Sequence, residues 1–427
     1  EPMPGIEKEH EYYQKLLPQI LLSDVSAVAD ILKQNSNKLI TLTGPEPKVQ
    51  QTLPTGEALL AKVNEVEKGV LNTYEEKVLA TSLLTTIPKA GKIISATKNN
   101  YLGTTELILS NGVSVTLKRT DFKNDQILMS AIRPGGKNNY GLKDKYNADY
   151  ATAVVGTMGV GKFSPDDLQK LLAGKSATAS PVFSSTTDGM NGSSSIKDAE
   201  TMLQLMYLYF TSPRKDVALF NSFVQKNKSQ LAFIGANPQI AFIDTLYKVM
   251  FNNNPLASAP IPKPENFDKI NLDRAMQIYK ERFGNAYGMH FTFVGSFKEN
   301  QLKPMIEKYI ASLPSANKNF NYADNKVRPI KGKVNMNVYK GTEQKSLSLV
   351  LYHGEIPYSY ELELKAAAIS EILNIRIIEE LREKIQGIYS GGISAQFEKI
   401  PYPNYSFVLE LPSGPENVDT LLFAAKK

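Results

Sequence analysis

A helix-then-strand unit occurs twice in this sequence, about 250 residues apart. The first copy spans residues 22–44 and the second spans residues 272–295. In each copy an aspartate, Asp24 or Asp273, stands where a helix N-cap is expected, and a later apolar run ends at a glycine. A spacing this long indicates duplicated domains and not a short-period solenoid.

The repeat divides the chain into predicted parts. They are the tail of one α/β domain at 1–44, a proline-punctuated connector at 45–100 with its main helix at 55–68, a domain at 101–325, and a second domain at 330–427. The sequence begins without Met and stops inside a predicted helix at 417–427. We therefore expect a fragment of a longer protein, with its last domain truncated.

Both larger domains combine helices with neighbouring strands. In the first we predict a hairpin with an Asn111-Gly112 turn, a strand at 126–133, a helix that follows Ser164, and a sheet edge at 177–195 that turns at Asp188-Gly189. In the second we predict strands at 338–340 and 346–352, a helix at 362–385 stopped by Gly387, and strands at 388–395 and 405–411. This order predicts an α+β fold of repeated domains, each a mostly antiparallel sheet covered by helices.

Composition excludes several classes of function. The 49 basic and 43 acidic residues leave a net charge of +6 that is spread along the chain, which disfavours nucleic-acid binding. The longest apolar run, residues 205–210, is far shorter than the roughly 20 residues that a membrane span needs. With no cysteine there is no disulfide, thiolate ligand or cysteine nucleophile.

Metal and serine chemistry are also unsupported by the sequence. The three histidines, His10, His290 and His353, lie too far apart to form a His-Glu-x-x-His motif or its inverse. The histidines at the two strands are more typical of satisfied edge or core residues than of ligands. No Gly-x-Ser-x-Gly elbow occurs, so we expect neither a metal nor a cofactor in this chain.

One stretch resembles a phosphate-binding loop. Residues 156–162 fit the first seven positions, but the Ser or Thr that would bind magnesium is replaced by Phe163. Asp166 and Asp167 would add negative charge beside the phosphates. A glycine-rich turn between elements is therefore the favoured interpretation over a nucleotide-binding module.

Arg382 and Tyr389 form the candidate pair. Arg382 lies in the last turns of the long helix, and Tyr389 follows the Gly387 stop on the next predicted strand. The turn between them would bring a cation and a phenol donor near one point beside a strand edge. The structural alternative is that the arginine complements the helix dipole and the tyrosine packs.

At these residues the sequence resembles the insulinase/pitrilysin family of zinc metallopeptidases, and within it the C-terminal half of a long bacterial member. The resemblance covers essentially the whole chain. Its landmarks are Leu109-Ser-Asn-Gly-Val113, Phe163-Ser-Pro-Asp-Asp-Leu168, Leu272-Asp-Arg-Ala with Phe291-Thr-Phe-Val-Gly295, and Leu381-Arg-Glu-Lys with Tyr389-Ser390.

The resemblance implies four similar domains in two halves, joined by a connector and closed around a peptide chamber. The first half would hold the inverted zinc motif, whose Glu activates the metal-bound water. The matching stretch here, residues 147–155, has neither His nor Glu, so the zinc belongs to the N-terminal catalytic half. Arg382 and Tyr389 match the family's Arg and Tyr, seven apart, which are implied to stabilise the substrate carbonyl and the tetrahedral intermediate.

The expected function is therefore the substrate-binding half of a zinc metalloendopeptidase, inactive alone. Its implied partners are the catalytic half and a peptide or unfolded polypeptide that docks on a sheet edge, and the resemblance favours a periplasmic or other cell-envelope location. The alternative is a non-catalytic scaffold or interaction subunit of the same fold. An intact inverted zinc motif upstream of Glu1 would favour the peptidase.

Overall fold

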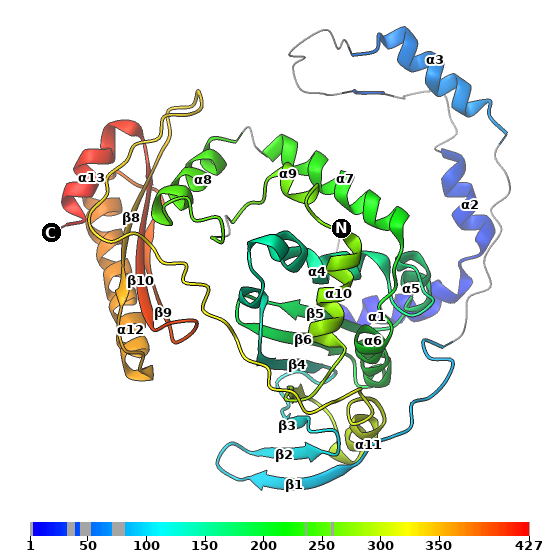
Figure 1. Ribbon diagram of the computed structural model, residues 1–427. Coiled ribbons are helices and arrows are strands. Elements are labelled where there is room, and N and C mark those ends of the chain that lie inside the picture. The colour runs from blue at the N-terminus through cyan, green and yellow to red at the C-terminus, as the bar shows by residue number, and fades with distance from the viewer. Residues whose placement is uncertain are drawn as a thin grey trace. The chain divides into compact units, whose positions relative to one another are not determined.

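The computed structural model describes residues 3–31, 39–42, 53–70, 82–234, 237–257 and 260–426. Contacts between residues divide the chain into two compact units, Glu1–Lys77 and Val78–Lys427. Every strand that the structure describes belongs to the second unit (Figure 1). In the described part of the chain, no helix has both the length and the apolar character needed to cross a membrane.

The described part of the first unit is helical. It contains α1 (Ile6–Leu16), a short 3-10 turn (Leu17–Gln19), α2 (Leu22–Ile31) and α3 (Gly56–Glu67). The helix predicted at 55–68 is confirmed as α3, because the Thr55 hydroxyl accepts a hydrogen bond from the Ala58 N–H at 3.2 Å and caps its first turn.

The strand predicted after α2 is not found where the structure describes the chain. Residues 39–42 have no strand partner, and 38 and 43–44 lie outside the described residues. An apolar run becomes a strand only when a neighbour takes up its backbone groups. Asp24 lies inside α2 and not at its N-cap, and its carboxylate accepts from the Leu21 N–H at 2.8 Å.

A seven-stranded sheet organises the first part of the second unit. Its strands are β1 (Ile93–Asn99), β2 (Thr104–Leu109), β3 (Ser114–Arg119), β4 (Ile127–Pro134), β5 (Ala177–Phe183), β6 (Thr187–Ser194) and β7 (His290–Gly295). They lie in the order β1-β2-β3-β7-β4-β6-β5, and the β3–β7 pair alone is parallel. The predicted α+β class with a mostly antiparallel sheet is confirmed.

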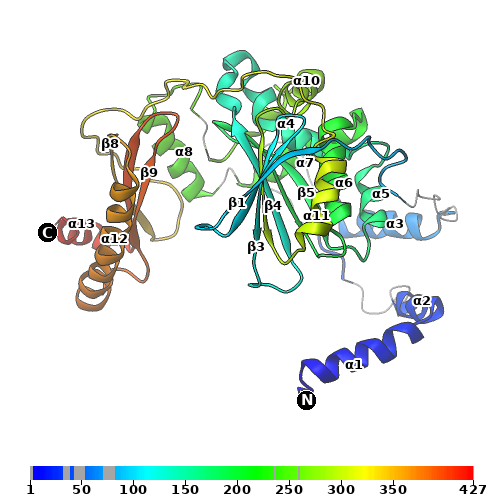
Figure 2. The ribbon, with the colours of Figure 1, turned by 90° about the horizontal axis from the view of Figure 1, so that it is seen from below.

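Helices cover one face of this sheet (Figure 2). They include α4 (Lys145–Met158), α6 (Ala199–Thr211), α10 (Leu272–Phe283) and α11 (Glu299–Tyr309). The same part of the chain also contains α5 (Pro165–Leu171), α7 (Val217–Ile234), α8 (Pro238–Met250) and α9 (Pro264–Phe267), with short 3-10 turns at Lys137–Asn139 and Leu142–Asp144. Along β4 buried and exposed residues alternate strictly, as expected when one face packs on helices. The core includes Leu107, Met129, Val155, Met206 and Phe291.

Three details differ from the sequence predictions. Strand β1 lies within the predicted connector, yet it pairs with β2 at the edge of the sheet. The N-cap of α10 is Asn271 and not Asp273, since the Asn271 side chain accepts from the Arg274 N–H at 2.9 Å. The Asp188-Gly189 dipeptide lies inside β6, and the chain turns between β5 and β6 at residues 184–186.

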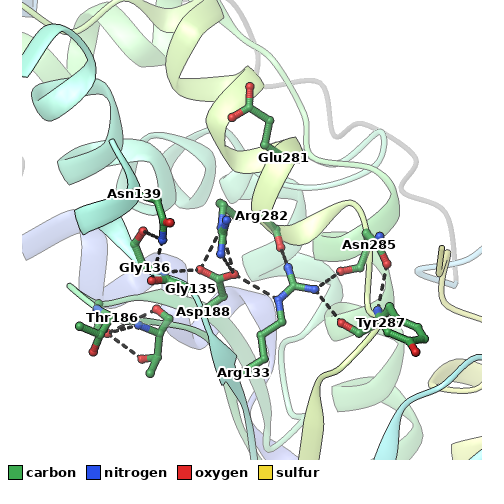
Figure 3. Close-up of polar contacts among 12 residues, drawn as sticks. Arg133, Gly135, Gly136, Asn139, Thr186, Asp188, Glu281, Arg282, Asn285 and Tyr287 are labelled. Carbon is green, nitrogen blue, oxygen red and sulfur yellow. Dashed lines mark hydrogen bonds and ion pairs between the residues drawn. The ribbon is translucent and has the colours of Figure 1, made fainter. Parts of the chain in front are cut away.

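Asp188 is in the strand because it belongs to a buried ion cluster (Figure 3). The Arg133 side chain donates to the Asp188 carboxylate at 3.1 Å, and the Arg282 guanidinium donates to the same carboxylate at 2.7 Å. Arg133 also donates to the carbonyl oxygens of Arg282, Asn285 (2.6 Å) and Tyr287 (3.1 Å). The cluster therefore ties β4, β6, α10 and the loop before β7 together.

Burial dominates the electrostatics of this cluster. The side chains of Arg133 and Asp188 have no exposed surface, and that of Arg282 is 11% exposed. Burial lowers the pKa of Arg133 to about 10, and the neighbouring Asp188 carboxylate acts in the opposite direction. The carboxylate also accepts the Gly136 N–H at 2.9 Å, so its hydrogen-bonding capacity is well used.

A separate three-stranded antiparallel sheet lies in the C-terminal part. Its strands, β8 (Ser346–Glu355), β9 (Gly392–Glu398) and β10 (Asn404–Ser413), lie in the order β8-β10-β9. Helix α12 (Tyr360–Ile377) continues as a wider π-helical segment (Ile378–Lys384), and a 3-10 turn (Pro415–Asn417) leads into α13 (Val418–Ala424). The predicted strand at 338–340 is wrong, because this segment pairs with no strand.

The two sheets share one order of elements. In chain order, β4 of the first sheet is followed by α4, the β5–β6 hairpin and α6. In the same way, β8 of the second sheet is followed by α12, the β9–β10 hairpin and α13. The strands also lie in matching orders, β4-β6-β5 and β8-β10-β9. This match supports duplication, and it makes β9 the counterpart of β5 and α12 the counterpart of α4.

Candidate functional site

Arg382 is positioned by the end of the long helix. Its neighbour Leu381 is 2% exposed and packs with Leu411 and Leu421, which fixes the π-helical segment on the sheet. The Arg382 side chain is about half exposed, and its Nε lies 3.7 Å from a carboxylate oxygen of Glu383. The packing of the helix thus fixes the backbone of Arg382, and its side chain remains accessible to solvent.

Tyr389 follows the helix stop. Gln386 has a φ of +57°, and the chain then reaches Ile388, which is buried and bridges to Ser413. Tyr389 therefore lies in the bend before β9. The sequence prediction that placed it in a strand is wrong. Tyr389 is 88% exposed.

The structure brings Arg382 and Tyr389 together. The central carbon of the guanidinium lies 5.6 Å from the centroid of the Tyr389 ring, within the range of a cation–π contact. An exposed cation and an exposed phenol side by side can both donate hydrogen bonds to a carbonyl oxygen. Their role toward a substrate stays a prediction.

An open hollow of about 460 Å³ begins immediately after Tyr389. It is lined by Asn374, Val408, Glu410, Pro412 and the segment 390–394. The Asn374 side chain reaches it from α12, where its Oδ1 accepts the Ile393 N–H at 2.7 Å and its amide nitrogen donates to the Ile393 carbonyl at 3.1 Å. Sequence reasoning missed this contact, because nothing in the pattern of α12 marks Asn374.

The stretch that matches the zinc motif lies on α4. There Ala148, Ala151, Val154 and Val155 are buried in the core, and the Asn147 side chain accepts the Asn271 N–H at 2.7 Å. Among the described residues, no group of three His, Asp or Glu side chains could hold a metal ion. These residues do not fit a zinc ion.

A second hollow, of about 650 Å³, lies beside α4. Its lining includes Lys145, Asp149 and Tyr150. Burial raises the pKa of Asp149, an effect that Lys137 and Lys145 oppose, and burial raises the pKa of Tyr150 to about 12. Mixed charges beside phenols suit polar contacts with a ligand, but they do not form a catalytic acid–base pair.

His290 makes the contacts that the sequence suggested for a satisfied strand residue. His290, on β7, lies 2.7 Å from the Ser114 hydroxyl through Nδ1 and 3.0 Å from the Thr116 hydroxyl through Nε2. It is a satisfied strand residue and not a ligand. The glycine-rich stretch 156–162 ends α4 and turns toward α5, with Gly159 and Gly161 at positive φ, so the prediction of a turn is confirmed.

Comparison with known proteins identifies related chains. Residues 269–427 match the family described as "Peptidase M16 inactive domain". The "Zinc protease PQQL-like" of Arabidopsis thaliana is 26% identical over 337 residues, 77% of this chain and 32% of the relative. The "Probable zinc protease PqqL" of Haemophilus influenzae is 23% identical over 424 residues, 98% of this chain and 44% of the relative.

Solved structures agree on the fold. The periplasmic protease PqqL from Escherichia coli matches with a TM-score of 0.71 at 18% identity, over 100% of this chain and 46% of that one. The first half of the same protease also matches, with a TM-score of 0.56 at 13% identity, over 76% of this chain and 70% of that one. This chain therefore shares its fold with part of that protease and with its first half.

The chain spans less than half the length of the curated relatives it matches. The resemblance to the insulinase/pitrilysin, or M16, metallopeptidases is confirmed. The chain is a homologue of the PqqL-like zinc proteases, and its residues 269–427 match the peptidase M16 inactive domain.

Proposed function

We propose that this chain is the substrate-binding half of a zinc metalloendopeptidase whose zinc motif lies on another half of the protein. The observation that carries the proposal is a contrast between the zinc-protease names of the relatives and the residues of this chain at the stretch that matches the zinc motif. The homologues are named zinc proteases, whereas the α4 stretch at 147–155 presents Asn147 and buried alanines and valines in place of ligands. A module of this fold without the metal retains sheets and hollows for holding a peptide.

Arg382 and Tyr389 are the groups through which this half would contribute to the reaction. Peptide hydrolysis builds negative charge on the carbonyl oxygen, and prepositioned donors stabilise that charge. Both side chains are exposed and close together, so a carbonyl oxygen can approach them without rearrangement of the backbone. In this proposal they are auxiliary catalytic residues that act across from the zinc.

The chain alone is expected to bind no stoichiometric zinc and to leave casein uncut. The physical reason is that no described group of His, Asp and Glu side chains can hold the ion. The purified chain is dialysed against zinc, freed of excess metal and analysed by mass spectrometry, and hydrolysis of fluorescein-labelled casein is followed in parallel. The anisotropy of the same casein should rise on binding, because an unfolded polypeptide is the proposed ligand.

The catalytic half of the same protein provides the positive control. When it is added, casein hydrolysis should appear or increase. One tightly bound zinc per isolated chain, or hydrolysis without the other half, would contradict the proposal. Binding of casein without any effect on hydrolysis by the catalytic half would favour the scaffold alternative.

A further inference from the structure

Sheet edges are where an extended peptide can add a strand, and the described strands leave four of them. Strand β1 has a register shift between Ile93 and Ser95 and contains Lys98, both of which oppose pairing with another chain. The free side of β8 corresponds to the side of β4 that β7 occupies, so it matches an interior position of the sheet. Strands β5 and β9 remain, and they are counterparts.

Strand β5 is blocked at its centre. The Ser184 N–H donates to the Thr187 carbonyl and the Ser195 N–H donates to the Ser176 carbonyl, so the even-numbered residues of this strand pair with β6. The odd-numbered residues direct their backbone groups to the free edge, and Pro181 is one of the two in the middle of the strand. Because proline has no N–H, an added strand would lose a hydrogen bond there.

The free edge of β9 offers backbone N–H groups at the positions where that of β5 has a proline. Both backbone groups of Ile393 point to the free edge, since the Asn374 side chain bonds to both of them at 2.7 and 3.1 Å. Backbone direction alternates along a strand, so Ala395 and Phe397 also direct their N–H and C=O groups outward. Strand β9 contains neither proline nor lysine.

Asn374 occupies the place that a neighbouring strand would take. A side-chain amide offers an N–H donor group and a C=O acceptor, as a backbone residue of an adjacent strand does. The approach is close, because a Cβ built on Gly392 would lie 2.8 Å from the Asn374 Oδ1. Asn374 therefore satisfies the first position of the edge and leaves the next two open.

We propose that an extended segment of the polypeptide substrate pairs with the free edge of β9 at Ala395 and Phe397, and that Asn374 marks the end of the paired stretch. This inference rests on the proposed function, because it names where the substrate-binding half holds its substrate. The paired stretch lies on the strand that begins three residues after Tyr389, next to the hollow lined by 390–394.

The two faces of β9 predict which side chains the segment carries. On one face Ala395 is opposite Phe407 and Phe397 is opposite Tyr405, and the three aromatic rings have centroids 6.0–6.2 Å apart. On the other face are the exposed side chains of Ser394 and Gln396. Residues directly opposite each other share a face, so the segment should alternate apolar and polar side chains.

The test uses the 427-residue chain and a fluorescein-labelled eight-residue peptide of alternating Val and Thr, with binding followed by fluorescence anisotropy. Ala395→Pro removes the outward N–H while leaving the β10 side of the strand intact, and it should weaken binding at least tenfold. Pro181→Ala, which restores an N–H on β5, should leave binding unchanged.

Methylated peptides test the register without altering the protein. Valines that face Phe397 and Phe407 are opposite the outward-directed residues, so their own N–H groups donate to β9. N-methylation of the valines should therefore abolish binding, and N-methylation of the threonines should change it less than twofold. This readout stands even if Ala395→Pro fails to fold.

The outcomes separate the two proposals. If the wild-type chain binds neither the peptide nor casein, the proposed function itself fails. If the wild-type chain binds, but Ala395→Pro binds equally well or both methylated peptides behave alike, the β9 edge is not the docking site while the proposed function stands.

Discussion

Replacing Asp188 with asparagine is expected to lower the free energy of unfolding by about 3–5 kcal/mol, because it leaves two buried guanidinium groups without their counter-charge. The substitution keeps the volume of the side chain and removes the charge. Water cannot compensate, since the Arg133 side chain has no exposed surface. Urea unfolding is followed by tyrosine fluorescence, for which the chain has 21 tyrosines and no tryptophan.

Asp268→Asn is the matched control. Asp268 forms an ion pair with Lys228 at 2.6 Å, but its side chain is 55% exposed. An exposed pair contributes about 1 kcal/mol or less, so this variant should unfold close to the wild type. Equal unfolding midpoints for the two variants would show that the buried cluster does not stabilise the fold.

Asp188 also shows where sequence reasoning fails. An Asp-Gly dipeptide in a Ser- and Thr-rich stretch is a strong local signal for a turn. The partners that hold Asp188 inside β6 are Arg133 and Arg282, 55 and 94 residues away in the sequence. Their contacts outweigh the local preference, and no spacing in the sequence indicates that they meet.

Features that depend only on residues close together in the sequence could be predicted. The hairpin turn at Asn111-Gly112 forms with Gly112 at a φ of +80°, the conformation that favours glycine. At the start of α5, the Ser164 side chain accepts the Asp167 N–H while the Asp167 carboxylate accepts the Ser164 N–H. Each needs only a few adjacent residues.

Strands were less predictable than helices, because a strand exists only with its partner. The segment at 338–340 has a strand-like sequence and no neighbour, whereas β1 was assigned to a connector although it pairs with β2. The choice between the β5 and β9 edges depends on register. Pro181 matters only because its missing N–H points outward, which the sequence alone does not reveal.

The candidate site was partly predictable for the same reason. Arg382 and Tyr389 are seven residues apart across one helix stop, so their proximity follows from local geometry. The contact of Asn374 with Ile393 spans 19 residues and depends on how α12 lies against β9. A polar residue on a helix that also exposes apolar side chains gives no signal of such a contact.

In the full-length protein, Arg382→Ala and Tyr389→Phe are each expected to lower kcat by roughly 100-fold, about 3 kcal/mol, and to change KM less. The reason is that charge on the carbonyl oxygen develops toward the transition state, so donors aimed at it act more strongly there than on the bound peptide. Hydrolysis of an internally quenched peptide over a range of concentrations separates kcat from KM. Because the two donors serve one oxygen, the double variant should lose less than the product of the single losses.

Arg376→Ala and Tyr352→Phe are the matched controls, since Arg376 is exposed on the same helix and Tyr352 is exposed on β8. Both should retain wild-type kcat. If Arg382→Ala and Tyr389→Phe also retain it, the pair is structural, and the cation–π contact is its whole role. If the two variants raise KM and leave kcat unchanged, Arg382 and Tyr389 bind the bound peptide and its transition state equally strongly and do not lower the barrier. This half would then act in substrate capture alone.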